Sequence, residues 1–363
     1  MCMPVFTVTT PLRSYPVLVE RDAASKLRDY IPERAGKVFV VTTVDVWDFH
    51  GARLTAALWG ISHEVLMFPG GEENKRLSEV EKLAEQMVAA GGDRTSVVVA
   101  FGGGIVNDVG GFLAACFMRG VPVIQIPTTL LAQVDAGVGG KTGVNLVSGK
   151  NLFGAFHQPL AVLIDPEVLS TLPEREYRAG LYEVLKTGVI RSAELFELMV
   201  KQRQAILARE DGVVEEMVAR SVAVKAAVVS ADERESGLRR ILNFGHTLGH
   251  ALEAETRYSR FLHGEAVAFG MRAAVHLGCL HGDLDEAEGR RINEAIASYG
   301  PIPSLKGVEA RALVRRLQSD KKTVQGRVHF VLPVRIGEVK VVAGIDEALI
   351  LEAAERAVKE VTP

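Results

Sequence analysis

The side chains best suited to bind a metal ion lie close together in the second half of the chain. His246 and His250 belong to the string NFGHTLGH and His263 follows, so three of the nine histidines share one region. Histidines four residues apart lie on one face of a helix, the geometry that lets H-E-x-x-H bind zinc, although no glutamate separates them here. Spacing alone therefore predicts a metal site on His246 and His250, with hydrogen-bonded core histidines as the alternative.

Glu183 and Lys186 could add to this site. They stand at i and i+3 of a predicted helix, and they offer a carboxylate ligand and a nearby cation. An ordinary surface pair is the alternative that local evidence favours.

A glycine-rich turn in the first half is suited to phosphate. The string FGGGIVND, residues 101–108, follows the apolar run SVVVA, and its glycines would let backbone N–H groups approach a pyrophosphate at a helix N-terminus. The strict dinucleotide fingerprint is not met, because Asn107 occupies its last glycine position and the turn follows a late strand. A tight turn without ligand is the alternative. The upstream loop GGEENK, residues 70–75, adds a carboxylate suited to ribose hydroxyls and a cation.

A second glycine-rich segment carries cations. It contains PTT at 127–129, GVGGKTGVN at 137–145 and GKN at 149–151. The GGKT string does not complete a Walker loop, because Asp135 stands where the first glycine is required. Lys141, Lys150 and Asn151 are donors suited to phosphate or carboxylate, with a solvated loop as the alternative. The basic pairs at 239–240 and 321–322 are, by themselves, typical of a solvated face.

Composition limits the class of protein. The 363 residues favour two domains, and 48% hydrophobic with 24% charged residues is typical of globular proteins. A net charge of −3 argues against a nucleic-acid partner. Cys2, Cys116 and Cys279 form no disulfide framework, and neither a signal peptide nor an 18-residue apolar run is present. We expect a cytoplasmic protein without a membrane partner.

Two predicted domains position the candidate ligand-binding motifs. Apolar runs that alternate with helical patterns predict an α/β domain over residues 1–170, a Rossmann-like doubly wound parallel sheet. Predicted strands are 17–19, 37–42, 63–68, 96–101, 121–126 and 161–165, and a predicted helix covers 78–90. Residues 171–363 predict an all-α domain, with helices over 174–190, 193–208, 212–231 and 246–255 and one short strand at 327–333. We expect the active site in a cleft between the domains.

Taken together, these strings resemble the 3-dehydroquinate synthase family of sugar-phosphate cyclases. The resemblance covers nearly the whole chain: GGEENK, FGGGIVND, RGVPVIQIPTTLLAQVDAGVGGKTGVN, GKNLFGAFHQP, GLYEVLKTG, ADERESGLRRILNFGHTLGHALE, HGEAVA and DKK. Departures are Asn107, Gly143 and Thr187, and none removes an ionisable group that the family's chemistry uses.

The resemblance implies a lyase of the shikimate pathway. It would convert 3-deoxy-D-arabino-heptulosonate 7-phosphate to 3-dehydroquinate and phosphate by transient oxidation with NAD, phosphate elimination, reduction and aldol closure. It also implies a zinc or cobalt ion and a homodimer in which Arg119 reaches the substrate phosphate of the neighbouring subunit.

The resemblance also assigns roles to residues. The metal ligands are Glu183, His246 and His263, and His250 becomes a proton-relay residue rather than a ligand. The expected NAD residues are Gly70, Gly71, Glu72, Glu73, Asn74, Lys75, Gly104, Ile105, Val106, Asn107, Asp108, Thr128, Thr129, Lys141, Lys150, Val168, Leu169, Ser170 and Thr171. The expected substrate residues are Lys150, Asn151, Lys186, Lys225, Arg239, Asn243 and one of Lys321 or Lys322. Asp135 is expected to orient groups near the nicotinamide and the substrate, and Lys141 belongs to the expected catalytic set.

Three other functions stay open on the sequence. One is another cyclase acting on a heptulose 7-phosphate or an amino analogue, against which Arg239, suited to a carboxylate, argues. A second is a metal-dependent polyol or glycerol-phosphate dehydrogenase, which would accumulate NADH. A third is a metal-binding structural or regulatory protein with an inactive site, which retention of every cationic position disfavours.

Overall fold

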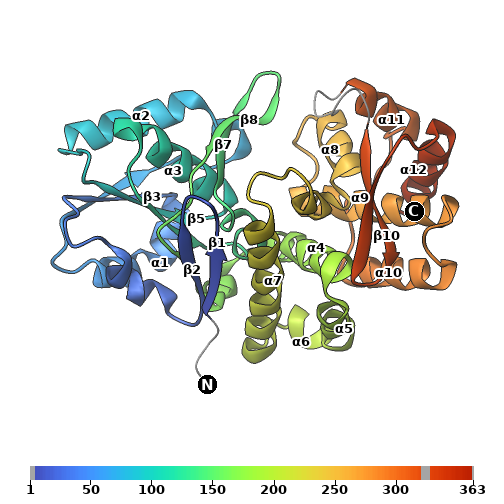
Figure 1. Ribbon diagram of the computed structural model, residues 1–363, viewed down its shortest axis with the longest axis horizontal. Coiled ribbons are helices and arrows are strands. Elements are labelled where there is room, and N and C mark those ends of the chain that lie inside the picture. The colour runs from blue at the N-terminus through green and yellow to red at the C-terminus, as the bar shows by residue number, and fades with distance from the viewer. Residues whose placement is uncertain (1–4, 320–327, 362–363) are drawn as a thin grey trace. The chain divides into compact units, whose positions relative to one another are not determined.

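The computed structural model describes residues 5–319 and 328–361 (Figure 1). The chain forms two compact units. The first comprises Met1–Pro173 and Val214–Arg234, and the second comprises Glu174–Val213 and Glu235–Pro363. The functional division expected at residue 170 stays a proposal, and helix α7 (Asp211–Ala231) falls almost wholly in the first unit.

The first unit contains a seven-stranded sheet. Its spatial order is β1 (Val5–Thr9), β2 (Ser14–Val19), β9 (Val162–Ile164), β6 (Val123–Pro127), β5 (Val97–Gly102), β3 (Val38–Thr42) and β4 (His63–Met67). β1 pairs antiparallel with β2 at one edge, and the remaining neighbours pair in parallel. The parallel α/β fold is confirmed, and the strand bounds differ from prediction by a few residues.

Helices cover both faces of this sheet. Successive side chains of a strand point to opposite faces. Phe39 and Val41 pack with α2 (Leu77–Ala89) and α3 (Gly104–Cys116). Val38 and Val40 pack with the 3-10 segment η1 (Ala23–Tyr30) and α1 (Val44–Ala57). Figure 1 shows α2 and α3 on one side of β3 and β5, and α1 on the other.

The strand order reverses between β3 and β5. The chain leaves β3 towards α1 on one face, and it leaves the neighbouring β5 towards α3 on the other. In doubly wound sheets, ligands bind at the carboxyl ends of the strands beside such a reversal. The glycine-rich turn after β5 lies at this position.

The glycine-rich segment from Lys141 to Phe156, for which the sequence predicts no strand, forms an antiparallel hairpin. Its strands are β7 (Lys141–Leu146) and β8 (Gly149–Phe156). Glycines allow close strand contact here, since a Cβ at Gly154 would lie 2.0 Å from the carbonyl oxygen of Thr142. Strand β1 was also missed.

The second unit is mainly helical. Its helices are α4 (Glu174–Arg191), α5 (Ala193–Lys201), α6 (Arg203–Leu207), α8 (His246–Glu255), α9 (His263–Leu280), α10 (Glu286–Ser298), α11 (Ala310–Ser319) and α12 (Glu347–Val361). The expectation of an all-α domain needs one correction, because β10 (His329–Arg335) and β11 (Glu338–Ala343) form a hairpin of which only the first strand was predicted. The predicted helix 193–208 is divided into α5 and α6 at Gln202. Among the described residues, no helix has the length and apolar character needed to cross a membrane.

Helix α3 packs unusually close to the sheet. A Cβ at Gly110 would lie 2.8 Å from the Cβ of Ala100 in β5. Asn107, which replaces the last fingerprint glycine, is buried and donates from Nδ2 to the Ala100 carbonyl at 3.2 Å. An amide hydrogen bond and a later glycine therefore hold the helix on the strand.

We predict that Gly110→Ala lowers the melting temperature. The added methyl group overpacks the interface between α3 and β5, which costs about 1–3 kcal/mol of unfolding free energy. Differential scanning calorimetry measures the change.

The matched control is Gly212→Ala in α7, where an added Cβ meets no heavy atom within 4 Å. This control should leave the melting temperature unchanged or raise it slightly. Equal melting temperatures for wild type and Gly110→Ala would show that the stability of the protein does not require close packing of α3 on β5 at Gly110.

Candidate functional site

Side chains from three helices of the second unit converge on one point. Glu183 comes from α4, His246 and His250 from α8, and His263 from α9. One ring nitrogen from each histidine lies within 4.8 Å of those of the other two. Oε1 of Glu183 lies 3.6 Å from Nε2 of His263 and 3.9 Å from Nε2 of His246. The structure thus gathers the three expected ligands together with His250.

Glycines permit the close helix contacts that bring these side chains together. A Cβ at Gly264, beside His263, would lie 1.9 Å from the Ala179 carbonyl oxygen of α4. A Cβ at Gly270 in α9 would lie 1.8 Å from the Gly245 carbonyl oxygen, and Gly245 precedes His246 with a φ of 80°. At these points the helices touch through backbone atoms, so short side chains on different helices can reach one ion.

Burial makes the carboxylate of Glu183 well suited to a cation. Glu183 is 1% exposed, and its Oε1 accepts no hydrogen bond among the described residues. Oε2 lies 2.5 Å from Nζ of Lys186 in an ion pair, and Lys186 is also buried. A buried charge needs compensation. Since imidazole and carboxylate are zinc ligands, the group fits a divalent ion of this type.

Outer contacts hold the imidazole of His263. Its Nδ1 lies 3.3 Å from Oε2 of Glu253, a buried residue of α8. Ligating histidines commonly donate their second ring N–H to a carboxylate in this way. Glu265 accepts from the backbone N–H of Leu262 at 2.8 Å and pairs with Arg175, which fixes the start of α9. Sequence reasoning missed Glu253, whose signal was its place on the α8 face that carries His246 and His250.

The second unit also holds part of the expected substrate set. Lys186 is buried on α4, and Arg239 is buried in the 3-10 segment η6 (Leu238–Asn243). Asn243 donates a short hydrogen bond to Glu235, which sequence reasoning did not identify. Glu235 has a φ of 61°, a strained conformation for a residue with a side chain. Lys321 and Lys322 lie outside the described residues.

The expected NAD residues collect at one edge of the first unit. The loop 70–75 follows β4, residues 104–108 follow β5, Thr128 and Thr129 follow β6, and residues 168–171 follow β9. Because these strands are parallel, their carboxyl ends lie at the same edge of the sheet. Oγ1 of Thr128 is buried and has no hydrogen-bond partner among the described residues. Helix α3 begins at Gly104, and no side chain of the described residues caps its N-terminus at Gly103.

Polar contacts tie the β7–β8 hairpin to this edge. Lys75 is 3% exposed, pairs with Asp108, and donates from Nζ to Oδ1 of Asn151 at 2.6 Å. Burial raises the pKa of the Asp108 carboxyl, and the adjoining Lys75 ammonium offsets part of that rise. Nζ of Lys150 lies 3.6 Å from Oε2 of Glu72. The structure therefore brings the expected cofactor residues Glu72, Lys75 and Asp108 together with the expected substrate residue Asn151.

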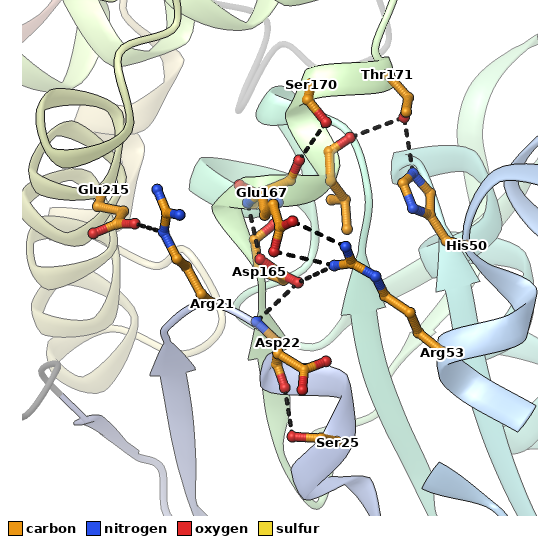
Figure 2. Close-up of polar contacts among 12 residues, drawn as sticks. Arg21, Asp22, Ser25, His50, Arg53, Asp165, Glu167, Ser170, Thr171 and Glu215 are labelled. Atoms are coloured by element: carbon orange, nitrogen blue, oxygen red, sulfur yellow. Dashed lines mark hydrogen bonds and ion pairs between the residues drawn. The ribbon is translucent and has the colours of Figure 1, made fainter. Parts of the chain in front are cut away.

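A separate network anchors residues 166–171, the segment η5 (Pro166–Thr171), as Figure 2 shows. Arg53 of α1 donates to both carboxylate oxygens of Glu167 at 3.2 and 2.9 Å, and lies 3.5 Å from Asp165. Nε2 of His50 lies 2.8 Å from Oγ1 of Thr171. Burial, with a smaller contribution from Arg53, lowers the pKa of His50, so the ring stays neutral at pH 7. The segment is thus held in place by α1.

Four further expected residues also lie in the first unit. Lys225 of α7 pairs with Asp135 of the π-helical segment η4 (Ala132–Ala136). Lys141 begins β7. Arg119 is exposed, with a φ of 70°, in the short segment η3 (Phe117–Arg119).

Comparison with known proteins gives consistent results along the whole chain. Residues 65–179 match the family 3-dehydroquinate synthase N-terminal, and residues 180–323 match 3-dehydroquinate synthase C-terminal. The chain is 62% identical to the 3-dehydroquinate synthase of Solibacter usitatus (strain Ellin6076) over 355 residues, which covers 98% of this chain and 99% of the relative.

Solved structures share the fold. One is 2-epi-5-epi-valiolone synthase from Streptomyces hygroscopicus subsp. jinggangensis 5008 with NAD+ and Zn2+ bound, with a TM-score of 0.89 and 29% identity, over 97% of this chain and 99% of that chain. Another is 2-deoxy-scyllo-inosose synthase complexed with carbaglucose-6-phosphate, NAD+ and Co2+, with a TM-score of 0.87 and 25% identity over the same shares.

We predict that Glu183→Gln weakens Zn2+ binding by at least tenfold. The substitution keeps the shape of the side chain and removes the charge that the buried ion would need. Competition with a chromogenic chelator measures the affinity. Glu174→Gln, at the exposed start of the same helix, is the control and should bind Zn2+ as wild type does. Unchanged affinity in Glu183→Gln would remove Glu183 from the ligand set.

Proposed function

The chain belongs to the 3-dehydroquinate synthase family, and we propose that the residues described above carry out that family's reaction. The protein converts 3-deoxy-D-arabino-heptulosonate 7-phosphate to 3-dehydroquinate and phosphate in the shikimate pathway. It is a carbon–oxygen lyase that uses NAD and a divalent metal. The observation that carries this conclusion is 62% identity over 98% of the chain to a 3-dehydroquinate synthase. Cyclases with other substrates are much less similar, at 29% and 25% identity.

We propose that NAD is held at the carboxyl edge of the parallel sheet. The residues fit it, because within the described part of the chain no side chain caps the N-terminus of α3 and the buried hydroxyl of Thr128 has no hydrogen-bond partner. Glu72 would offer carboxylate oxygens to ribose hydroxyls, and the first backbone N–H groups of α3 would hold the pyrophosphate. Lys75, with Asp108, fixes the loop after β4. NAD bound there would supply a reversible hydride acceptor for oxidation of the substrate alcohol.

We propose Glu183, His246 and His263 as the metal ligands. Three protein ligands leave positions open for substrate hydroxyls, as in catalytic zinc sites. The ion would supply a Lewis acid for oxidation of the substrate alcohol. Glu253 orients His263, and Lys186 balances the charge of Glu183. His250 lies with its ring centroid 5.2 Å from that of His246, and we assign it to proton transfer rather than to ligation.

We propose that four cations and two amide side chains bind the anionic substrate. The cations are Lys150, Lys186, Lys225 and Arg239, and the amides are Asn151 and Asn243. Buried cations from separate chain segments are costly unless they share an anion. Arg239 would bind the substrate carboxylate, since its planar fork makes two hydrogen bonds to such a group. Asp135 holds the Lys225 ammonium and thereby positions it.

Assembly and location are part of the proposal. We propose a cytoplasmic homodimer in which the exposed Arg119 reaches the substrate phosphate of the second subunit. A net charge of −3 gives no support for a nucleic-acid partner.

We predict that NAD is needed only in catalytic amount. With the heptulosonate phosphate and substoichiometric NAD, many equivalents of phosphate should be released while absorbance at 340 nm stays flat. A coupled phosphate assay measures this. Accumulation of NADH in step with turnover would instead identify a dehydrogenase.

We predict that Arg239→Lys reduces kcat/KM about 5–150-fold, the worth of roughly 1–3 kcal/mol for a hydrogen bond to a charged group. Charge is kept and the bidentate fork is lost, so the dissociation constant of NAD should barely change. Arg240→Lys, the partly exposed neighbour, is the matched control and should retain wild-type kinetics. Weakened NAD binding with intact substrate kinetics would show that Arg239 is wrongly placed.

A further inference from the structure

Asn145 lies where the β7–β8 hairpin loses its regular register. Pairing shifts between Val144 and Leu146, so Asn145 stands at an irregularity of the ladder. Such irregularities re-aim side chains and are frequent next to active sites. Asn145 is 6% exposed, and its backbone N–H donates to the Lys75 carbonyl at 2.8 Å. The residue is therefore fixed against the loop that follows β4.

The amide nitrogen of Asn145 holds Glu72. Nδ2 donates to Oε1 of Glu72 at 2.7 Å and to the Glu72 carbonyl at 3.3 Å. A carboxylate can only accept, so the amide orientation is fixed by chemistry. One carboxylate oxygen is thereby oriented, and the carboxylate keeps further lone pairs for hydroxyl donors.

The amide oxygen of Asn145 holds Asn151. Oδ1 accepts the backbone N–H of Asn151 at 2.8 Å. Asn151 has a φ of 54°, in the left-handed region, and Lys75 binds its side-chain oxygen at 2.6 Å. A strained backbone persists only where its surroundings fix it. The buried amide of Asn145 thus orients Glu72, a proposed NAD-binding residue, through its nitrogen. It orients Asn151, a proposed substrate-binding residue, through its oxygen.

We propose that Asn145 is a positioning residue that couples NAD binding to binding of the substrate anion. The proposal rests on the proposed function, which gives Glu72 to the cofactor and Asn151 to the substrate. Contact of NAD with Glu72 would restrict the Asn145 amide, which in turn would restrict Asn151 to its observed conformation. The coupling is reciprocal, so substrate bound at Asn151 tightens NAD by the same factor.

The variant Asn145→Asp separates the contact with Glu72 from the contact with Asn151. Aspartate keeps an acceptor for the Asn151 N–H, but it places a second carboxylate against Glu72. We expect the dissociation constant of NAD to rise about tenfold or more, as for loss of a hydrogen bond to a charged group. The KM of the heptulosonate phosphate at saturating NAD should change less than threefold. Asn145→Ala loses both contacts and should raise both constants.

Thr142→Val is the matched control. Thr142 is a buried residue of the same strand whose Oγ1 donates to the Ala155 carbonyl at 2.8 Å. The variant loses one hairpin hydrogen bond and leaves Glu72 and Asn151 untouched. It should lower the melting temperature about as much as Asn145→Ala while leaving both constants within twofold of wild type.

A double-mutant cycle distinguishes positioning from general stability. If Asn145 acts through Glu72, then adding Asn145→Ala to Glu72→Ala should not weaken NAD binding further. Titration calorimetry measures each constant. Additive effects in this cycle, or an equal effect of Thr142→Val, would overturn the proposal. Wild-type protein that binds no NAD would instead overturn the proposed function, and the inference with it.

Discussion

Backbone contact between helices is the constraint on which the geometry of the proposed metal site depends. Glu183, His246 and His263 come from three helices, and their reach is short. An ordinary helix pair is separated by about 8–10 Å between axes because side chains lie between them. Here, Gly264 against α4 and Gly270 against Gly245 remove those side chains. Glu183 is also 1% exposed, so its charge requires a cation beside it.

The proposed NAD site depends on a different constraint, the common direction of the parallel strands. The four segments that follow β4, β5, β6 and β9 begin at one edge of the sheet because these strands point the same way. Three of the segments are then fixed locally, by contacts of Lys75 with Asp108, of Asn107 with Ala100, and of Arg53 with Glu167. Hydrogen bonds to charged groups orient the donors and acceptors before a ligand arrives, which lowers the ordering cost of binding.

Apolar strands and helical periodicity made most of the fold predictable, since runs such as VVVAF are buried on both faces. The β7–β8 hairpin was not predictable, because glycine has low strand propensity and here permits the contact of Gly154 with Thr142. Spacing alone paired His246 with His250. It could not reveal His263 as a partner, because that contact joins two helices. Glu253 and Asn145 were missed because they act through other residues.

The most direct test of this account is the Zn2+ affinity of Gly264→Ala. Gly278→Ala on the same helix is the control, because its Cβ would meet nothing closer than 3.4 Å. We expect Gly264→Ala to lose at least tenfold in Zn2+ affinity and to keep its NAD affinity, because we assign NAD binding to residues of the first unit. Gly278→Ala should bind both as wild type does. Wild-type Zn2+ affinity in Gly264→Ala would show that the metal site does not depend on this backbone contact.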